Sequence, residues 1–472
     1  MTCRTVPGPS HAREGALRSV KILFGFMSAA LVAGPAILPL SAEASGVGAK
    51  RGVAVFALGY GGRDIPLETL GGVDEAIRKL FDDFGRFEVI GMRQRLSQKG
   101  VEELLDALLK NERDGAVDPE GYRFGKAEIT AAEFSSLLEA FAIAIPVLSE
   151  FDSSFDETEG RWETDIKADV TLIGSGGAAL GIARVESKGM DETDQESSIS
   201  KAVEGIPMRL QYELRKIDAF RFSARILAVS GKDIELGLGR GAGVKNGDEY
   251  AVVAGGRAED IENASELGLV VIGKAGPNAS TGRVLYSRID LGEESRLEEI
   301  PRLGVDLEPY LHFVAGRNLD LPADPKGAEG VNAVAGIRIP VSRGFYGLRP
   351  YGAIQVPTSG VRGIAAAFVF PVDLLLGAEY RSNSGRISLT PYCGIGIGYV
   401  YVSETIYGES SDSSDTLIPH IGGHAYLNLA FLASRDIRIF AELGGEYWIS
   451  TVTDLYTDYG GIGFGAGIAI KL

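Results

Sequence analysis

The sequence contains few of the residues on which most catalytic and metal sites depend. Its 472 residues include only four His and two Cys, which leaves little material for a His/Cys metal site or a catalytic triad. The G-x-S-x-G, H-E-x-x-H and P-loop patterns are absent from it. We therefore predict a protein that is not an enzyme, binds no metal and needs no cofactor.

Positive charge is also scarce. The chain has 47 Lys and Arg against 64 Asp and Glu, a formal charge of −17. Because binding to a nucleic-acid backbone requires a basic surface, this balance argues against a nucleic-acid partner. The acidic runs at residues 152–159 and 191–196 lack the spacing of a calcium loop, and we interpret them as solvated surface.

Glycine, by contrast, is abundant. It accounts for 63 of the 472 residues, about 13% against a typical usage of about 7%. Hydrophobic residues make up 45% and charged residues 24% of the chain, which is the balance of a folded protein. At roughly 100–200 residues per domain, this length predicts two to four domains.

The first 44 residues have the pattern of a signal peptide. Four basic residues up to Lys21 precede an apolar run at residues 22–40, and Ala42 and Ala44 offer the small residues of a cleavage site. The run is long enough to be an uncleaved membrane anchor, but its prolines and the small residues that follow it favour cleavage. Cys3 has no lipobox around it, so only Cys393 would remain and no intrachain disulfide could form.

Residues 45–222 predict an α/β domain. Short apolar runs predict strands near residues 52–58, 86–90, 162–173 and 178–186, and apolar residues recur at helical spacing near 73–84, 101–108, 134–141 and 198–217. Pro207 should kink the last helix. The glycine loops at residues 59–62 and 174–179 do not open a helix directly, so we interpret the second as a hairpin turn rather than a phosphate-binding loop.

The order of these pieces resembles the domain shared by the curli-secretion protein CsgG and its periplasmic relatives. The matching parts are residues 53–56, residues 86–90 followed by Arg93 and Leu96, and residues 198–203. The resemblance implies a periplasmic domain that acts in secretion or assembly. Two features depart from the family: the chain has no lipidated cysteine, and residues 152–159 form an acidic insertion where a short connection is expected.

Residues 223–298 predict a small all-β module. Strands near 224–229 and 234–238 flank a Ser-Gly-Lys-Asp turn, and Asn246-Gly247 precedes a further strand. The module resembles the one that ends the flagellar assembly protein FlgT, in which a G-x-x-x-G-V-K-x-G-D turn precedes a strand. That turn is residues 239–248 here, and we interpret it as structural.

Residues 299–472 carry the strongest pattern, that of an eight-stranded antiparallel transmembrane β-barrel. Apolar residues alternate with small or charged ones in eight segments, and the links alternate between short and long, as in outer-membrane barrels. Glycine on the inward rows would relieve crowding in a narrow interior. A soluble all-β domain is the alternative. The segments are residues 305–316, 331–341, 346–357, 364–381, 386–403, 417–433, 436–450 and 457–472.

The size of this barrel resembles the OmpA/OmpX type, and its final segment resembles the terminal strand read by the outer-membrane insertion machinery. Leu472 stands where an aromatic residue is usual. The alternating residues of this predicted insertion signal are Phe464, Ala466, Ile468, Ile470 and Leu472.

The inward rows also carry charged and His side chains, which we predict to form a salt-bridged network filling the lumen, because buried charges in so narrow an interior must pair. A metal site at His420 and His424 is the alternative that we disfavour. The predicted network comprises Asp306, Glu308, His312, Arg338, Arg349, Asp373, Glu379, His420, His424, Arg438, Glu442 and Glu446.

The predicted architecture is thus an α/β periplasmic domain and a small all-β module, followed by an eight-stranded barrel in the bacterial outer membrane. The partners we expect are outer-membrane lipid, the barrel insertion machinery and an unidentified periplasmic protein. The predicted function is to anchor a partner-binding domain for envelope assembly or secretion. A homo-oligomeric pore or secretion channel is the second candidate, and an enzyme is the third.

Overall fold

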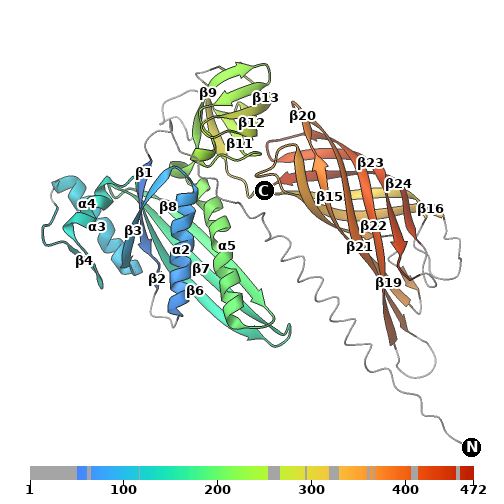
Figure 1. Cartoon of the computed structure of the whole chain (residues 1–472), viewed down its shortest axis with the longest axis horizontal. Helices are drawn as coiled ribbons and strands as arrows, with labels where there is room; N and C mark the ends of the chain where they lie inside the picture. Colours follow the sequence, from blue (N-terminus) through green and yellow to red (C-terminus); the bar gives the residue numbers. More distant parts are fainter. Residues whose placement is uncertain are drawn as a thin grey trace, which may run out of the picture.

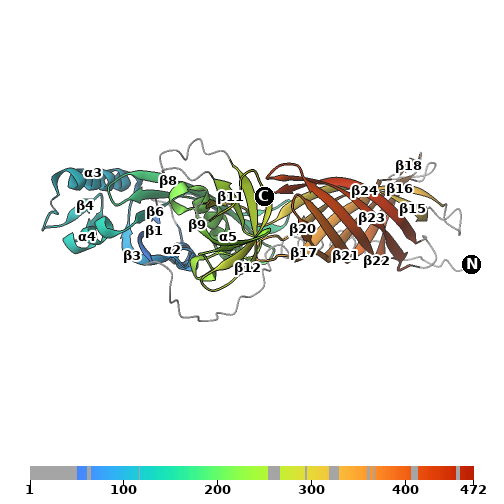
Figure 2. The same ribbon diagram turned by 90° about the horizontal axis from the view of Figure 1, so that it is seen from above.

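Three folded units follow one another in the computed structural model, with a small barrel between an α/β unit and a larger barrel (Figures 1 and 2). The predicted signal peptide, residues 1–44, lies outside the described residues. These are residues 50–60, 65–115, 117–253, 266–292, 295–317, 329–358, 362–364, 367–405, 413–452 and 458–472.

A mixed sheet with the order β3-β1-β6-β7-β8 forms the centre of the α/β unit. β1 runs parallel to β3 and β6, and β6, β7 and β8 follow as antiparallel neighbours. β2 (Gly59–Tyr60) pairs with the far part of β6. The five main strands are β1 (Arg51–Ala57), β3 (Phe87–Arg95), β6 (Ala142–Asp156), β7 (Arg161–Gly174) and β8 (Ala179–Asp191).

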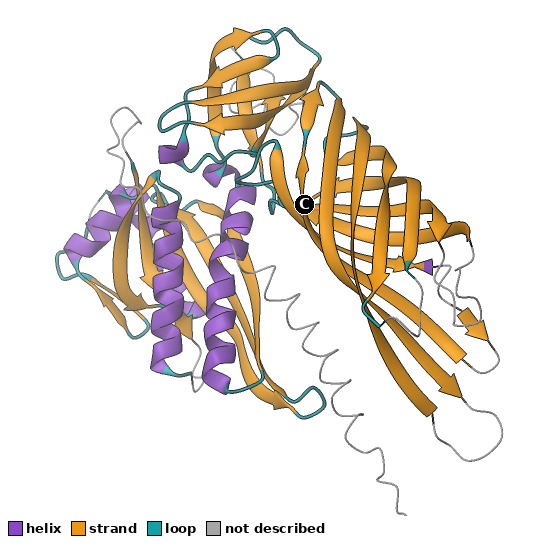
Figure 3. Cartoon of the chain, turned by 45° about the vertical axis from the view of Figure 1, so that its right-hand side comes forward, coloured by secondary structure: helices purple, strands orange, loops and turns teal. Residues whose placement is uncertain are grey.

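Helices cover both faces of this sheet because its central strands carry apolar residues on both sides (Figure 3). α2 (Leu67–Asp83) and α5 (Gln195–Lys216) pack against the side of β1 that carries Val53 and Val55. α3 (Gln98–Asp114) and α4 (Ala131–Glu139) bury the opposite side. α5 continues past Pro207, and residues 174–177 turn the β7–β8 hairpin as predicted. A small hairpin of β4 (Tyr122–Phe124) and β5 (Ala127–Ile129) was not predicted.

The expected acidic insertion at residues 152–159 is strand as far as Asp156, and its side chains are exposed or half-buried, as expected for a solvated surface. β6 continues to Asp156 and stays paired with β7 down to Asp156↔Arg161, so the two strands form one long hairpin. Near its tip Phe155 is 47% exposed, and its ring lies edge-on to Trp162 at 5.5 Å between centroids. Four polar residues among Asp152–Asp156 leave little apolar alternation in the segment, and alternation is the signal by which strands are recognised.

The small unit is a closed barrel of six strands in the order β10-β13-β12-β11-β14-β9. Its β14 was not predicted, and the expected boundary at residues 298/299 falls inside that strand. Short 3-10 turns, η1 (Asp218–Phe220) and η2 (Arg240–Ala242), flank its first hairpin. The strands are β9 (Ser223–Ser230), β10 (Asp233–Leu236), β11 (Glu249–Val253), β12 (Gly268–Ala275), β13 (Ser280–Ser287) and β14 (Arg296–Ile300).

The large barrel has eight antiparallel main strands, as predicted, and the pairing of β19 with β21 closes the ring. β18 (Arg362–Ile364) and β20 (Ser382–Ser384) are short additions to it. The main strands are β15 (Asp306–Arg317), β16 (Glu329–Pro340), β17 (Leu348–Pro357), β19 (Ala367–Tyr380), β21 (Ile387–Thr405), β22 (Ser413–Leu432), β23 (Ile437–Ser450) and β24 (Tyr459–Lys471).

Large apolar side chains point outward from the barrel and polar ones inward. Ile395, Leu443 and Ile462 are 78%, 64% and 73% exposed, whereas Glu442 on the inward row is 4% exposed. Glycine supplies interior space, since a Cβ at Gly398 would lie 2.5 Å from Asp373 Oδ1. Among the described residues, no helix is long and apolar enough to cross a membrane.

The α/β unit and the small barrel join the large barrel at the end that carries its short links. Arg343, in the link from β16 to β17, donates to Asp248 Oδ1 (2.9 Å) and to Gln211 Oε1 on α5 (2.9 Å). Arg215 on α5 ion-pairs with Glu299 on β14. The predicted turn at residues 239–248 therefore has a role beyond local structure, because its Asp248 contacts Arg343 of the large barrel and lies 3.9 Å from Arg215 on α5.

Replacing Gly247 by Ala should loosen this joint. Gly247 has φ +82°, and an added Cβ would lie 2.0 Å from the Ser342 carbonyl oxygen. Gly231→Ala is the matched control, because Gly231 has φ +62° with nothing within 4 Å of the added Cβ. Both variants lose about 1–2 kcal/mol to backbone strain, but only Gly247→Ala should expose residues 301–305 to limited proteolysis. Equal cleavage of the two variants would contradict the close contact.

Candidate functional site

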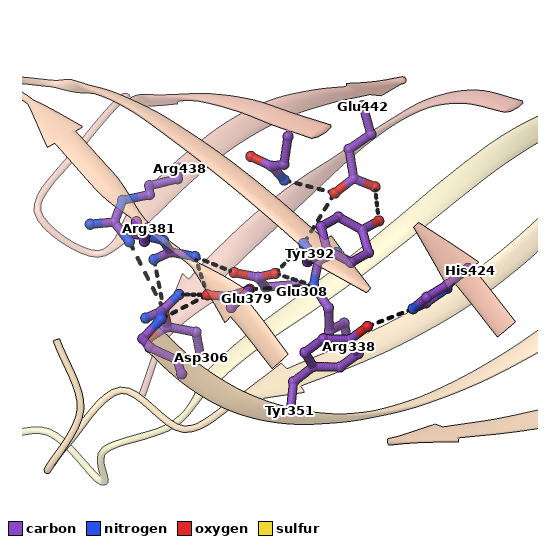
Figure 4. Close-up of polar contacts among 12 residues, drawn as sticks. Asp306, Glu308, Arg338, Tyr351, Glu379, Arg381, Tyr392, His424, Arg438 and Glu442 are labelled. Atoms are coloured by element: carbon purple, nitrogen blue, oxygen red, sulfur yellow. Dashed lines mark hydrogen bonds and ion pairs between the residues drawn. The ribbon is translucent and has the colours of Figure 1, made fainter. Parts of the chain in front are cut away.

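The middle of the large barrel is occupied by a hydrogen-bonded cluster around Glu442 on β23 (Figure 4). Its Oε1 accepts from Arg338 Nη2 (3.1 Å) and Asn428 Nδ2 (2.7 Å). Its Oε2 lies 2.7 Å from His312 Nε2 and accepts from the Tyr392 hydroxyl (2.9 Å). These groups come from five different strands, so the cluster ties the barrel wall together across its interior.

A second cluster lies toward the small barrel. Arg349 on β17 donates to Glu379 Oε1 (2.7 Å) and to Asp306 Oδ2 (3.0 Å). Arg381, just after β19, donates to the same Asp306 oxygen (3.2 Å) and to Glu308 Oε1 (2.9 Å). Glu308 Oε2 also accepts from Arg338 Nε (2.8 Å), so the two clusters are continuous.

A third group lies farther from the small barrel and has a different composition. Gln355 on β17 donates from one Nε2 to Asp373 Oδ2 (3.2 Å) and to Glu446 Oε2 (3.1 Å). The Tyr459 hydroxyl donates to the other oxygen of Asp373, and Tyr310 donates to Gln355 Oε1 (2.9 Å). Among the described residues, no basic side chain forms an ion pair with Asp373 or Glu446.

The histidines are placed apart rather than together. His424 Nε2 lies 2.7 Å from the Tyr351 hydroxyl, and His420 Nδ1 lies 3.3 Å from the Ile418 carbonyl oxygen. Two positions four residues apart on one strand are separated by roughly 13 Å, too far for one metal ion to bridge. Within the described ranges, no group of three or more His, Cys, Asp or Glu is arranged to hold a metal ion.

The structure places all twelve predicted lumen residues inside the barrel, with 0–6% of their surface exposed. Sequence reasoning missed Gln355, Arg381 and Lys471, which are 1%, 7% and 5% exposed. Each lies an even number of residues from the other inward-facing residues of its segment. Strict alternation along the segment therefore predicts an inward position for all three. Alternation along a strand indicates which face a residue occupies, but it does not indicate which residues pair across the interior.

The terminal segment proposed as an insertion signal is β24, which pairs with β15 and β23. Its Phe464 and Ile468 are 60% and 46% exposed on the outer surface. Whether the insertion machinery reads this strand stays a prediction.

The joint with the small barrel extends the charged network out of the large barrel. Glu249 on β11 accepts from Lys471 Nζ (2.5 Å) and from Arg302 Nη2 (3.1 Å). Burial alone would raise the pKa of Glu249, but these two cations hold it below its usual value. Arg302 also ion-pairs with Asp436 in the β22–β23 link (2.7 Å). The joint is therefore built from ionised groups that compensate one another.

No protein-family model and no curated protein matches the sequence. Among solved structures, Neisserial surface protein A is similar to it, at 13% identity over 36% of this chain and 97% of that one, with a TM-score of 0.26. The N-terminal β-barrel domain of Pseudomonas aeruginosa OprF is similar at 11% identity over 35% of this chain and 97% of that one, with a TM-score of 0.21.

A major outer membrane protein from Thermus thermophilus is also similar, at 7% identity over 36% of this chain and 99% of that one, with a TM-score of 0.23. At such scores these likenesses carry no argument of their own. The barrel architecture is established by the strand pairing described above.

Proposed function

We propose that this chain is a non-enzymatic outer-membrane protein whose barrel anchors a periplasmic domain, and that this domain binds a protein partner in envelope assembly or secretion. The observation that carries the proposal is the position of the α/β unit and the small barrel at the short-link end of the large barrel. Short links are periplasmic in outer-membrane barrels. The outward apolar side chains of the barrel suit lipid.

The side chains that fill the large barrel favour a role as a membrane anchor over a role as a channel. Gln355 on β17 contacts Glu446 on β23, four strands away around the ring, and Tyr459 on β24 contacts Asp373 on β19, likewise four strands away. Bonds between opposite walls obstruct the lumen, as expected for an eight-stranded barrel filled by its own side chains.

The assembly or secretion role rests on the resemblance of residues 45–222 to the CsgG-like domain and of residues 223–298 to the FlgT module. The β6–β7 hairpin supports partner binding, because the half-exposed Phe155 beside Trp162 is the kind of aromatic anchor that protein interfaces use. An oligomeric pore built by the α/β unit is the competing hypothesis.

The full-length chain in planar bilayers should show no stable single-channel conductance, and site-specific cross-linking from the hairpin tip in cells should capture a periplasmic protein. Phe155→Ser should reduce that capture at least tenfold. Leu227→Ser is the control, because Leu227 is similarly exposed, at 50%, but lies on the small barrel. Conductance together with a ladder of stable oligomers would favour the pore instead.

A further inference from the structure

A cavity of about 40 Å³ lies between the small barrel and the adjoining end of the large one. Gly247 and Glu249 line it from the small barrel, and Arg349, Arg381, Arg438 and Lys471 line it from the large barrel. A water molecule needs roughly 10–15 Å³ of such volume, so the cavity has room for about three waters or one small ion.

The lining is rich in positive charge. Arg302 also lines the cavity, so five basic side chains face it. The carboxylates in the lining are those of Glu249 and Asp306. Most of these cations have a close carboxylate partner: Arg302 and Lys471 contact Glu249 at 3.1 and 2.5 Å. Arg349 contacts Asp306 at 3.0 Å, and Arg381 contacts Glu308 at 2.9 Å.

Arg438 on β23 differs from the others. It is 6% exposed, and its nearest carboxylate oxygen, Asp306 Oδ2, lies 3.9 Å away. That oxygen already accepts from Arg349 and Arg381. Among the described residues, the Arg438 side chain makes no hydrogen bond, although a guanidinium has five N–H donors. A buried cation so poorly compensated is costly, and it favours binding of an anion.

We propose that this cavity binds a small oxyanion, a phosphate or a carboxylate, through the guanidinium of Arg438. The planar fork of a guanidinium matches two oxygens of such an ion, and the cavity volume admits an ion of that size. The lining side chains point into the barrel end and the joint rather than toward the lipid face, so the expected ligand is a free ion and not a lipid headgroup.

The test uses the full chain in a zwitterionic detergent and phosphate-free buffer. Addition of inorganic phosphate or acetate should raise the unfolding temperature saturably, since a ligand of the folded state stabilises it by mass action. Arg438→Gln should weaken the apparent affinity at least tenfold. Arg435→Gln is the control: Arg435 is a neighbouring cation outside the lining, 43% exposed and paired with Glu266, and its loss should change the affinity less than twofold.

Calorimetric titration of the native protein supplies an independent readout if Arg438→Gln fails to fold. No saturable response of the native chain to phosphate, sulfate or acetate would overturn the site, as would an undiminished response in Arg438→Gln. Vesicles of phosphatidylglycerol in phosphate-free buffer distinguish the ligand source. A response to the vesicles alone would overturn the assignment to a free ion.

Discussion

Replacing Glu442 by Gln should lower the stability of the barrel strongly, whereas the same change at Glu446, four residues farther along the same inward row of β23, should leave the stability unchanged or raise it. Glu442 is the shared acceptor of Arg338, Asn428, His312 and Tyr392. Removing its charge leaves Arg338 buried with less compensation, and breaking a buried ion pair costs about 3–5 kcal/mol.

Glu446 is as buried as Glu442, at 4% exposed, but its described hydrogen bond comes from the neutral amide of Gln355. It shares that amide with Asp373, so two carboxylates meet without a basic partner among the described residues. Because these two acidic side chains share one amide donor, replacing Glu446 by a neutral amide removes one of them without depriving a described basic side chain of its partner. The expected change in the free energy of unfolding is within about 1 kcal/mol, or stabilising.

Urea unfolding of the two variants in detergent, followed by heat-modifiable mobility on gels, measures both effects. Each substitution is isosteric and on the same strand, so each serves as the other's control. Equal destabilisation by the two variants would show that the clusters around Glu442 and Glu446 are not electrostatically distinct.

Leu443→Arg should sharply reduce the amount of folded protein in outer-membrane fractions. Leu443 is 64% exposed on the outward row in the middle of β23. An Arg on the lipid face near the middle of the membrane costs roughly 2–4 kcal/mol, and this penalty falls to about 0–1 kcal/mol near the membrane surface.

Ile437→Arg is the matched control, because Ile437 is on the same row of the same strand, 40% exposed, but at its first residue. It should insert almost normally. If both variants are recovered in the folded, membrane-extracted fraction at the native level, the outer face of this barrel does not lie in lipid.

Most of the large barrel was predictable because its signal is local: alternation along one segment identifies both the strand and its faces. Strands with weak alternation could not be recognised from the sequence. β14 carries two adjacent Glu residues in a five-residue strand. None of β6 was predicted: it begins as a continuous apolar run at residues 142–148 and ends in a largely polar segment, so neither half alternates clearly.

Side-chain contacts between strands could not be predicted from the sequence for a different reason. The inward position of Arg338 follows from parity, but its contact with Glu442 depends on how the closed ring brings β16 near β23. The choice of Gln355 rather than an Arg as the neighbour of Glu446 depends on the same closure. Likewise, nothing local in residues 239–248 indicates that Asp248 meets a turn of the large barrel.

The contact between Lys471 and Glu249 couples closure of the large barrel to completion of its joint with the small barrel. Asp306 on β15 pairs with Lys471 on β24 across the seam where the first and last barrel strands meet. The same Lys471 holds Glu249 of the small barrel. A barrel open at this seam cannot present Lys471 correctly, so the Lys471–Glu249 part of the joint forms only when the ring is complete. The contacts of Arg343 with Asp248 and Gln211 do not involve this seam. Only a closed large barrel thereby completes its joint with the small barrel.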